Sequence, residues 1–127
     1  MRDERPLKLL RRTPVDADHV DAMVALAERA DALAADAGKD LQSEFGKEHV
    51  ALIVGCNQFV RFYRDGEHAG RMEVWLSDAA DFDVHPAVGG TVFQMFGWRT
   101  MDPRDAKAPD AMQAAFARAL TTTTSAF

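Results

Sequence analysis

Three polar residues alternate near the middle of the chain, where Asp81, Asp83 and His85 form a D-x-D-x-H pattern. Carboxylate oxygens and imidazole nitrogens are ligands of divalent metal ions, and an extended backbone would place alternate side chains on one side. The segment lacks the glycine and the distal glutamate of a calcium-binding loop. Acids in such connections usually form turns. We therefore predict neither a metal site nor a cofactor.

Cys56, the only cysteine, could act as a nucleophile if His49, His68 or His85 served as its base. Such a reaction also needs an orienting group and an oxyanion hole, and no motif in the sequence indicates either. A small, half-buried cysteine at the end of a strand is the competing interpretation. We expect no catalytic residues and no enzymatic activity. Loop 77–90 is where an enzyme or small-ligand site would otherwise form.

The charge is unevenly distributed along a chain whose net charge is −5. Residues 1–12 carry five bases and two acids, a net charge of +3, whereas residues 13–48 carry nine acids and three bases, a net charge of −6. An acidic body argues against nucleic acid, which needs a basic footprint, and suits a basic protein partner. Plain solubility is the alternative explanation.

The cellular setting follows from cysteine content and hydropathy. A single cysteine excludes an internal disulfide, which fits a reducing compartment. No apolar run is long enough for a membrane helix or a secretory signal. We expect a cytoplasmic protein without membrane attachment.

The hydrophobic periodicity predicts an α+β fold in the order α-β-β-β-loop-β-α. Apolar residues at helical spacing predict a long helix between an N-cap at Asp16 and a C-cap at Gly38. The predicted strands span 49–55, 59–64, 71–76 and 91–101, and the last helix spans 109–120. Short hairpins require antiparallel pairing. We expect a single antiparallel sheet of about four strands, packed on one face by the two helices.

The chain length fits one domain. The predicted parts are a flexible basic arm at 1–14, a single α+β domain at 15–121 and a frayed tail at 122–127. Pro6 and Pro14 disfavour a helix in the arm, which could be an edge strand or a flexible tail. Residues 40–48 are expected to form a loop or a short turn.

Alternation within two neighbouring strands assigns side chains to the two faces of the sheet. Val60, Phe62, Met72, Val74 and Leu76 would face the helices, and Arg61 would pair with Glu73 on the other face. Aromatic residues and arginine on an uncovered face are typical of protein interfaces. The residues predicted to contact a partner are Phe59, Arg61, Tyr63, Glu73, Trp75 and Trp98. Core packing is the competing interpretation for Trp98, and the arm or loop 77–90 could cover this face.

These features favour a small acidic protein-binding module, of the type of a bacterial inhibitor or immunity protein that neutralises a basic effector or toxin by covering its surface. A homodimeric secretion chaperone for an effector is the second hypothesis. A small-ligand protein or enzyme that uses loop 77–90 is the third. All three rest on analogy at the level of the fold.

Overall fold

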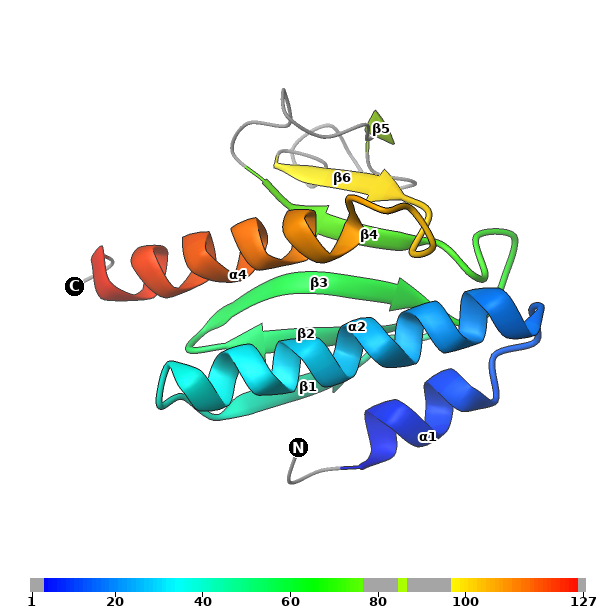
Figure 1. Cartoon of the computed structure of the whole chain (residues 1–127), viewed down its shortest axis with the longest axis horizontal. Helices are drawn as coiled ribbons and strands as arrows, with labels where there is room; N and C mark the ends of the chain where they lie inside the picture. Colours follow the sequence, from blue (N-terminus) through cyan, green and yellow to red (C-terminus); the bar gives the residue numbers. More distant parts are fainter. Residues whose placement is uncertain (1–3, 77–84, 87–96, 126–127) are drawn as a thin grey trace.

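The computed structural model describes residues 4–76, 85–86 and 97–125, which form an α+β fold (Figure 1). The helices are α1 (Arg5–Arg11), α2 (Ala17–Asp36) and α4 (Ala108–Ser125). The strands are β1 (Leu41–Phe45), β2 (His49–Val54), β3 (Asn57–Tyr63), β4 (Met72–Trp75), β5 (His85–Pro86) and β6 (Trp98–Met101).

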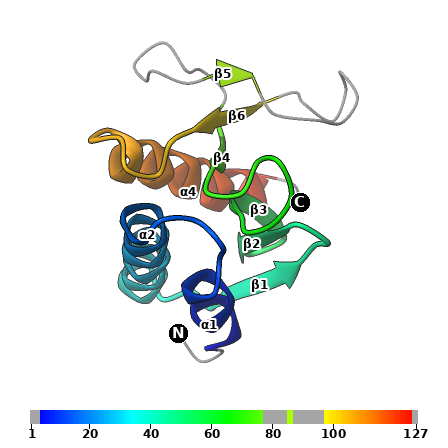
Figure 2. The same cartoon turned by 90° about the vertical axis from the view of Figure 1, so that its right-hand side faces the viewer.

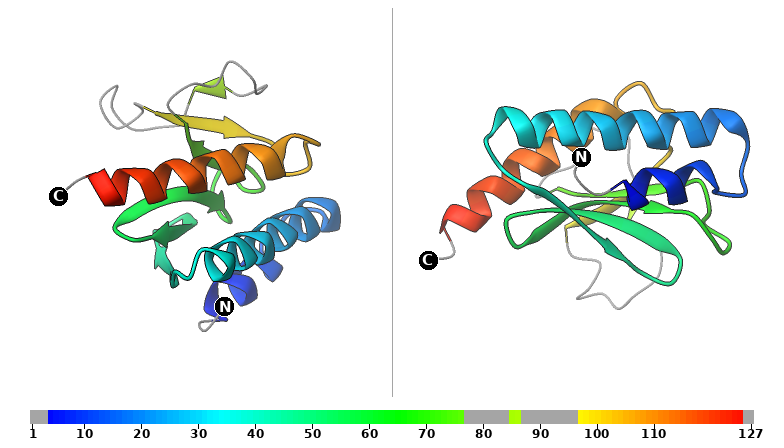
Figure 3. Two further views of the ribbon diagram at one scale, coloured as in Figure 1. Left: turned by 60° about the vertical axis from the view of Figure 1, so that its left-hand side comes forward. Right: turned by 90° about the horizontal axis from the view of Figure 1, so that it is seen from below.

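All six strands belong to one antiparallel sheet in the order β1-β2-β3-β4-β6-β5. Helices α2 and α4 cover one face of this sheet, and α1 lies beside α2 (Figures 2 and 3). The predicted fold class is therefore confirmed, although the described residues contribute six strands to the sheet instead of about four. In the described part of the chain, no helix combines the length and the apolar character needed to cross a bilayer.

Helix α2 begins and ends where its sequence predicts. The carboxylate of Asp16 accepts a hydrogen bond from the backbone N–H of His19 at 3.0 Å, which satisfies one of the free donors of the first turn. Gly38 follows the helix with φ of 67°, a left-handed conformation that glycine adopts without strain. The helix buries Met23, Leu26 and three alanines against the rest of the core.

The structure also contains three elements that periodicity did not predict, which are α1, β1 and, within the expected loop 77–90, the short strand β5. Residues 5–11, expected to be an edge strand or flexible, form α1 because Pro6 fits the first turn of a helix, where no backbone donor is required. Leu10 of α1 is completely buried. Within the expected loop 40–48, β1 pairs with β2 along its whole length.

The C-terminal helix is longer than predicted, because α4 continues through Ser125 into the expected tail. The wider division of the chain into an arm, a domain and a tail stays a prediction.

A β-bulge in β3 changes the face on which Phe59 lies. Leu52 pairs with Val60 but Ile53 pairs with Gln58, so Phe59 has no partner on β2. Its ring is completely buried and meets Phe116 of α4 edge to face, with 5.3 Å between ring centroids. The assignment of Phe59 to the partner-binding face was therefore wrong, because simple alternation does not anticipate a bulge.

We predict that Phe59→Ala lowers the free energy of unfolding by about 3–5 kcal/mol, the usual cost of removing a buried aromatic ring. Phe45→Ala is the matched control, because Phe45 is 36% exposed and its loss should cost about 1 kcal/mol or less. Urea denaturation of both variants measures the difference. Equal costs for the two variants would contradict the buried position of Phe59.

Candidate functional site

The face of the sheet opposite the helices carries a connected set of polar and aromatic side chains. We call this set the sheet-face network. Its members are Glu44, Gln58, Arg61, Tyr63, Glu73 and Trp98, which come from β1, β3, β4 and β6. Four of the six residues predicted to bind a partner belong to it, so the sequence located this surface although it misplaced two members.

Glu73 is the buried centre of the network, with a side chain that is only 1% exposed. The register of β4 places it directly opposite Arg61 on β3 and Thr100 on β6. The Tyr63 hydroxyl donates a hydrogen bond to Glu73 Oε1 at 2.7 Å, and Arg61 Nη1 lies 3.7 Å from the same oxygen. The predicted pair of Arg61 and Glu73 is thus confirmed. A buried carboxylate needs such partners because desolvation of an isolated charge is very costly.

Arg61 connects Glu73 to the outer part of the sheet. Its guanidinium carbon lies 3.8 Å from the centroid of the Trp98 ring, which is a cation–π contact. Arg61 Nε donates to Gln58 Oε1 at 2.9 Å, and Gln58 Nε2 donates to Glu44 Oε2 at 2.6 Å. Arg61 is 27% exposed, so it is held in place by neighbours on two sides while part of it still meets solvent.

The surroundings of Tyr63 and His49 favour the neutral form of each side chain. Burial, followed by the hydrogen bond to Glu73, raises the pKa of Tyr63 far above its usual value. Burial, followed by the nearby charge of Arg61, lowers the pKa of His49. The two rings lie side by side with 5.6 Å between their centroids. Near neutral pH this part of the sheet face therefore presents the phenol of Tyr63 and the uncharged imidazole of His49.

Trp75 lies outside the sheet-face network. The guanidinium carbon of Arg118 on α4 lies 3.6 Å from the centroid of the Trp75 ring, so this tryptophan contacts the helix layer. Burial lowers the pKa of Arg118, and its Nη1 atom has no hydrogen-bond partner among the described residues. Trp98 is 8% exposed and contributes mainly by supporting Arg61.

Three further residues of this face were not predicted as site residues. His49 lies opposite Tyr63, Glu44 lies on β1, and Gln58 lies next to the bulge. The alternation of β2 could have placed His49 beside Tyr63. Glu44 and Gln58 could not be assigned without β1 and the bulge, which depend on tertiary pairing.

The residues considered for catalysis or metal binding do not form a site in the described structure. Cys56 is exposed in the β2–β3 turn, at the opposite end of β2 from His49. Asp81 and Asp83 lie outside the described residues, and for His85 only the backbone pairing with Thr100 is described. Within residues 4–76, 85–86 and 97–125, no group of three or more potential ligands could hold a metal ion.

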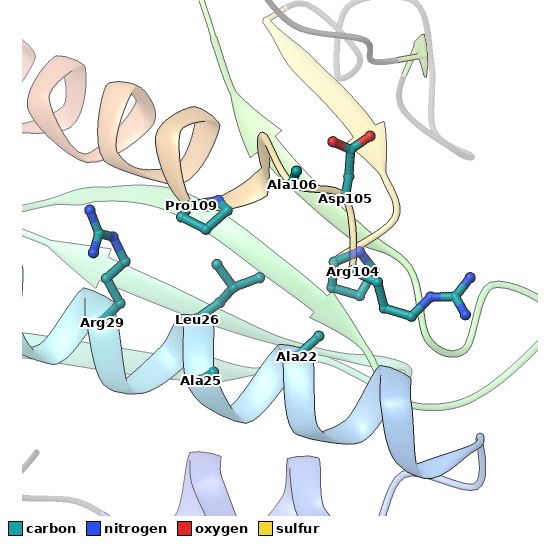
Figure 4. Close-up of a pocket in the computed structure, with 9 residues that line it drawn as sticks. Ala22, Ala25, Leu26, Arg29, Arg104, Asp105, Ala106 and Pro109 are labelled. Atoms are coloured by element: carbon teal, nitrogen blue, oxygen red, sulfur yellow. The ribbon is translucent and has the colours of Figure 1, made fainter.

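A groove lies on the other side of the molecule, between α2 and the connection from β6 to α4 (Figure 4). Its volume is about 490 Å³. The residues that form its apolar lining are Ala22, Ala25 and Leu26 of α2, Pro103 and Ala106 of the connection, and Pro109 of α4.

Polar side chains lie between the connection and the start of α2. Arg104 Nη2 lies 2.8 Å from Asp102 Oδ2, and these hydrogen bonds lower the pKa of Asp102 to about 2. His19 lies between Asp16 at 2.8 Å and Asp102 at 3.7 Å. One wall of the groove is therefore tied to the N-terminal end of α2.

Comparison of the chain with protein-family models, with curated proteins and with solved structures finds no match in any of the three. The function must therefore be argued from the geometry.

We predict that Tyr63, the only tyrosine in the chain, remains protonated in the folded protein well above the ordinary pKa of about 10. Because the folded pKa is raised, the stabilisation is present below the pKa of the unfolded state and is lost as pH rises above it. The ultraviolet absorbance of tyrosinate during an alkaline titration measures this. Glu73→Gln should shift the titration to lower pH. Ordinary titration of native Tyr63 would contradict its hydrogen bond to Glu73.

We also predict that Asp102 stabilises the protein above pH 4 by about 1–2 kcal/mol. Its folded pKa of about 2 lies below the usual 3.8, so this contribution is lost as pH falls from about 4 towards 2. Asp102→Asn should therefore be less stable than the natural chain at pH 6, and the difference should shrink at pH 2. Urea denaturation at both pH values tests this, and a difference that does not depend on pH would contradict it.

Proposed function

We propose that this protein is a small protein-binding module of the bacterial inhibitor or immunity type, which neutralises another protein by covering its surface. The binding surface is the face of the sheet opposite the helices. The proposal places the protein in the cytoplasm, where the exposed thiol of Cys56 stays reduced.

The observation that carries the proposal is the order of the sheet-face network. Arg61 is held between the Trp98 ring, the Gln58 amide and the Glu73 carboxylate before any partner binds. Side chains that are already ordered lose less conformational entropy on association. Arginine and aromatic residues are also the types enriched at binding hot spots.

Around this ordered centre the sheet offers a surface that a partner can reach. Glu44 is exposed, while His49, Ile53 and Tyr63 are partly exposed. Ile53 adds an apolar side chain beside these polar ones, and protein interfaces usually combine apolar and polar groups. Because each side chain projects from a paired strand, the surface is stiff and suits a partner of fixed shape.

The acidic body of the chain supports a basic partner such as an effector or toxin. Residues 13–48 have a net charge of −6, from nine acids and three bases. Such a field increases the rate of encounter with a basic protein. The contacts that hold the complex would then come from the sheet face.

The proposal is tested by affinity capture from the native host with Ile53→Arg, which places a large charged side chain on the sheet face directly opposite Gln58. Ala32→Arg, on an exposed position of α2, adds the same charge elsewhere. We expect one stoichiometric partner with the natural chain and with Ala32→Arg. Its affinity should fall at least about 30-fold with Ile53→Arg, the equivalent of a hot-spot loss of about 2 kcal/mol.

Two results would overturn the proposal. One is capture of the same partner with equal affinity by both variants. The other is a natural chain that captures no partner. Sedimentation velocity on the purified protein shows whether a second copy occupies the sheet face, in which case Ile53→Arg would convert a dimer to a monomer.

A further inference from the structure

The groove between α2 and the β6–α4 connection has an apolar interior and polar edges. Ala22 and Ala25 contribute small side chains to the α2 wall of the groove. Leu26 extends from the same helix towards Pro109 of α4 (Figure 4). Arg104 and Asp105 of the connection also line the groove (Figure 4). Few polar atoms face the interior, so apolar groups of an occupant would fill it.

The charged residues that line the groove are Arg29, Arg104 and Asp105, and further carboxylates flank it along α2. Asp18 and Asp21 lie one helical turn before Ala22 and Ala25, and Glu28 lies one turn after Ala25, so all three share the same exposed side of α2. The other charged residues of the connection and of the start of α4 are Asp102, Lys107 and Asp110.

Two of the three cations are already engaged within the protein. Arg104 is bonded to Asp102 at 2.8 Å, and Arg29 Nη2 donates to the Gln113 amide oxygen at 2.9 Å. Arg104 is therefore already paired with a carboxylate, whereas Arg29 keeps its positive charge beside a neutral amide. An occupant with a basic outer side would instead meet the carboxylates of α2 without displacing these bonds.

The same chain already shows this kind of packing on the opposite side of α2. Helix α1 is basic, with Arg5, Lys8 and Arg11, and it buries Pro6 and Leu10. It lies beside the acidic α2, on the side away from α4 (Figure 1). A short basic amphipathic helix is thus an occupant that one side of α2 accommodates within the fold.

We propose that the groove binds a basic amphipathic helix of a partner protein. Its apolar residues enter the space lined by Ala22, Ala25 and Leu26, and its Lys or Arg side chains lie along Asp21 and Glu28. This is recognition of a helix in a groove, strengthened by complementary charge. The surface is separate from the sheet face, so the two proposals can fail independently.

The test uses a fluorescent synthetic peptide of leucine and lysine, about 14 residues long, the length at which an isolated helix begins to be stable. Leucines are placed on one helical face. The full chain is titrated against it and fluorescence anisotropy is measured. Two comparison peptides are required. One has the same composition in a scrambled order without an apolar face, and the other replaces lysine by glutamate.

Two variants of the protein locate the binding site, each with a matched control. Ala25→Gln fills the groove, and Ala32→Gln makes the same change outside it on the same helix. Asp21→Asn with Glu28→Gln removes two charges at the groove, and Asp36→Asn with Asp40→Asn removes two charges at exposed positions beyond it.

We expect the leucine–lysine peptide to bind more tightly than both comparison peptides. Ala25→Gln should weaken binding at least about 10-fold, and the Asp21/Glu28 double variant should weaken it several-fold and reduce its salt dependence. Both control variants and Ile53→Arg should bind like the natural chain. If Ile53→Arg still binds the peptide, the groove acts independently of the sheet face. A failure of one proposal can then be distinguished from a failure of the other.

The proposal is overturned if the peptide does not bind, if the glutamate peptide binds equally well, or if Ala25→Gln has no effect. It is also overturned if Ala25→Gln converts a dimer to a monomer in sedimentation velocity, because the occupant would then be a second copy of this chain.

Discussion

Glu73 is a carboxylate with almost no solvent exposure at the centre of an antiparallel sheet, and the sheet face opposite the helices is organised by its need for partners. A buried charge without hydrogen bonds would destabilise the fold by several kcal/mol. Tyr63 and Arg61 supply the required partners, and Arg61 is in turn positioned by Trp98 and Gln58. The unfavourable burial of the Glu73 carboxylate is thus offset by an arrangement of side chains on three neighbouring strands.

The two sides of the molecule consequently differ in chemistry. The sheet face is stiff, polar and aromatic, because its side chains are bonded to one another across paired strands. The helix side has a groove with a mainly apolar lining. Exposed carboxylates of α2 flank the small alanines that line it. A protein that uses both sides would bring a rigid surface to one partner element and a helix-accepting groove to another.

The relation between pattern and position can be followed at single residues. The alternation of β4 correctly placed Met72 and Val74 towards the helices and Glu73 on the other face, because β4 is regular and pairs without a shift. The same rule failed at Phe59, where the bulge adds one residue to β3. Trp75 was placed on the open face, but its ring contacts Arg118, which is 43 positions away along the chain.

By itself, the sequence determined the α+β class, the long capped helix and the pairing of Arg61 with Glu73. These features depend on local periodicity, on capping residues and on the register of one short hairpin. Only the tertiary structure decided the bulge, strand β1, the burial of Glu73 and the groove beside α2. Each of these depends on which distant segments pack together, and the free energy of that packing is not encoded in any short stretch of residues.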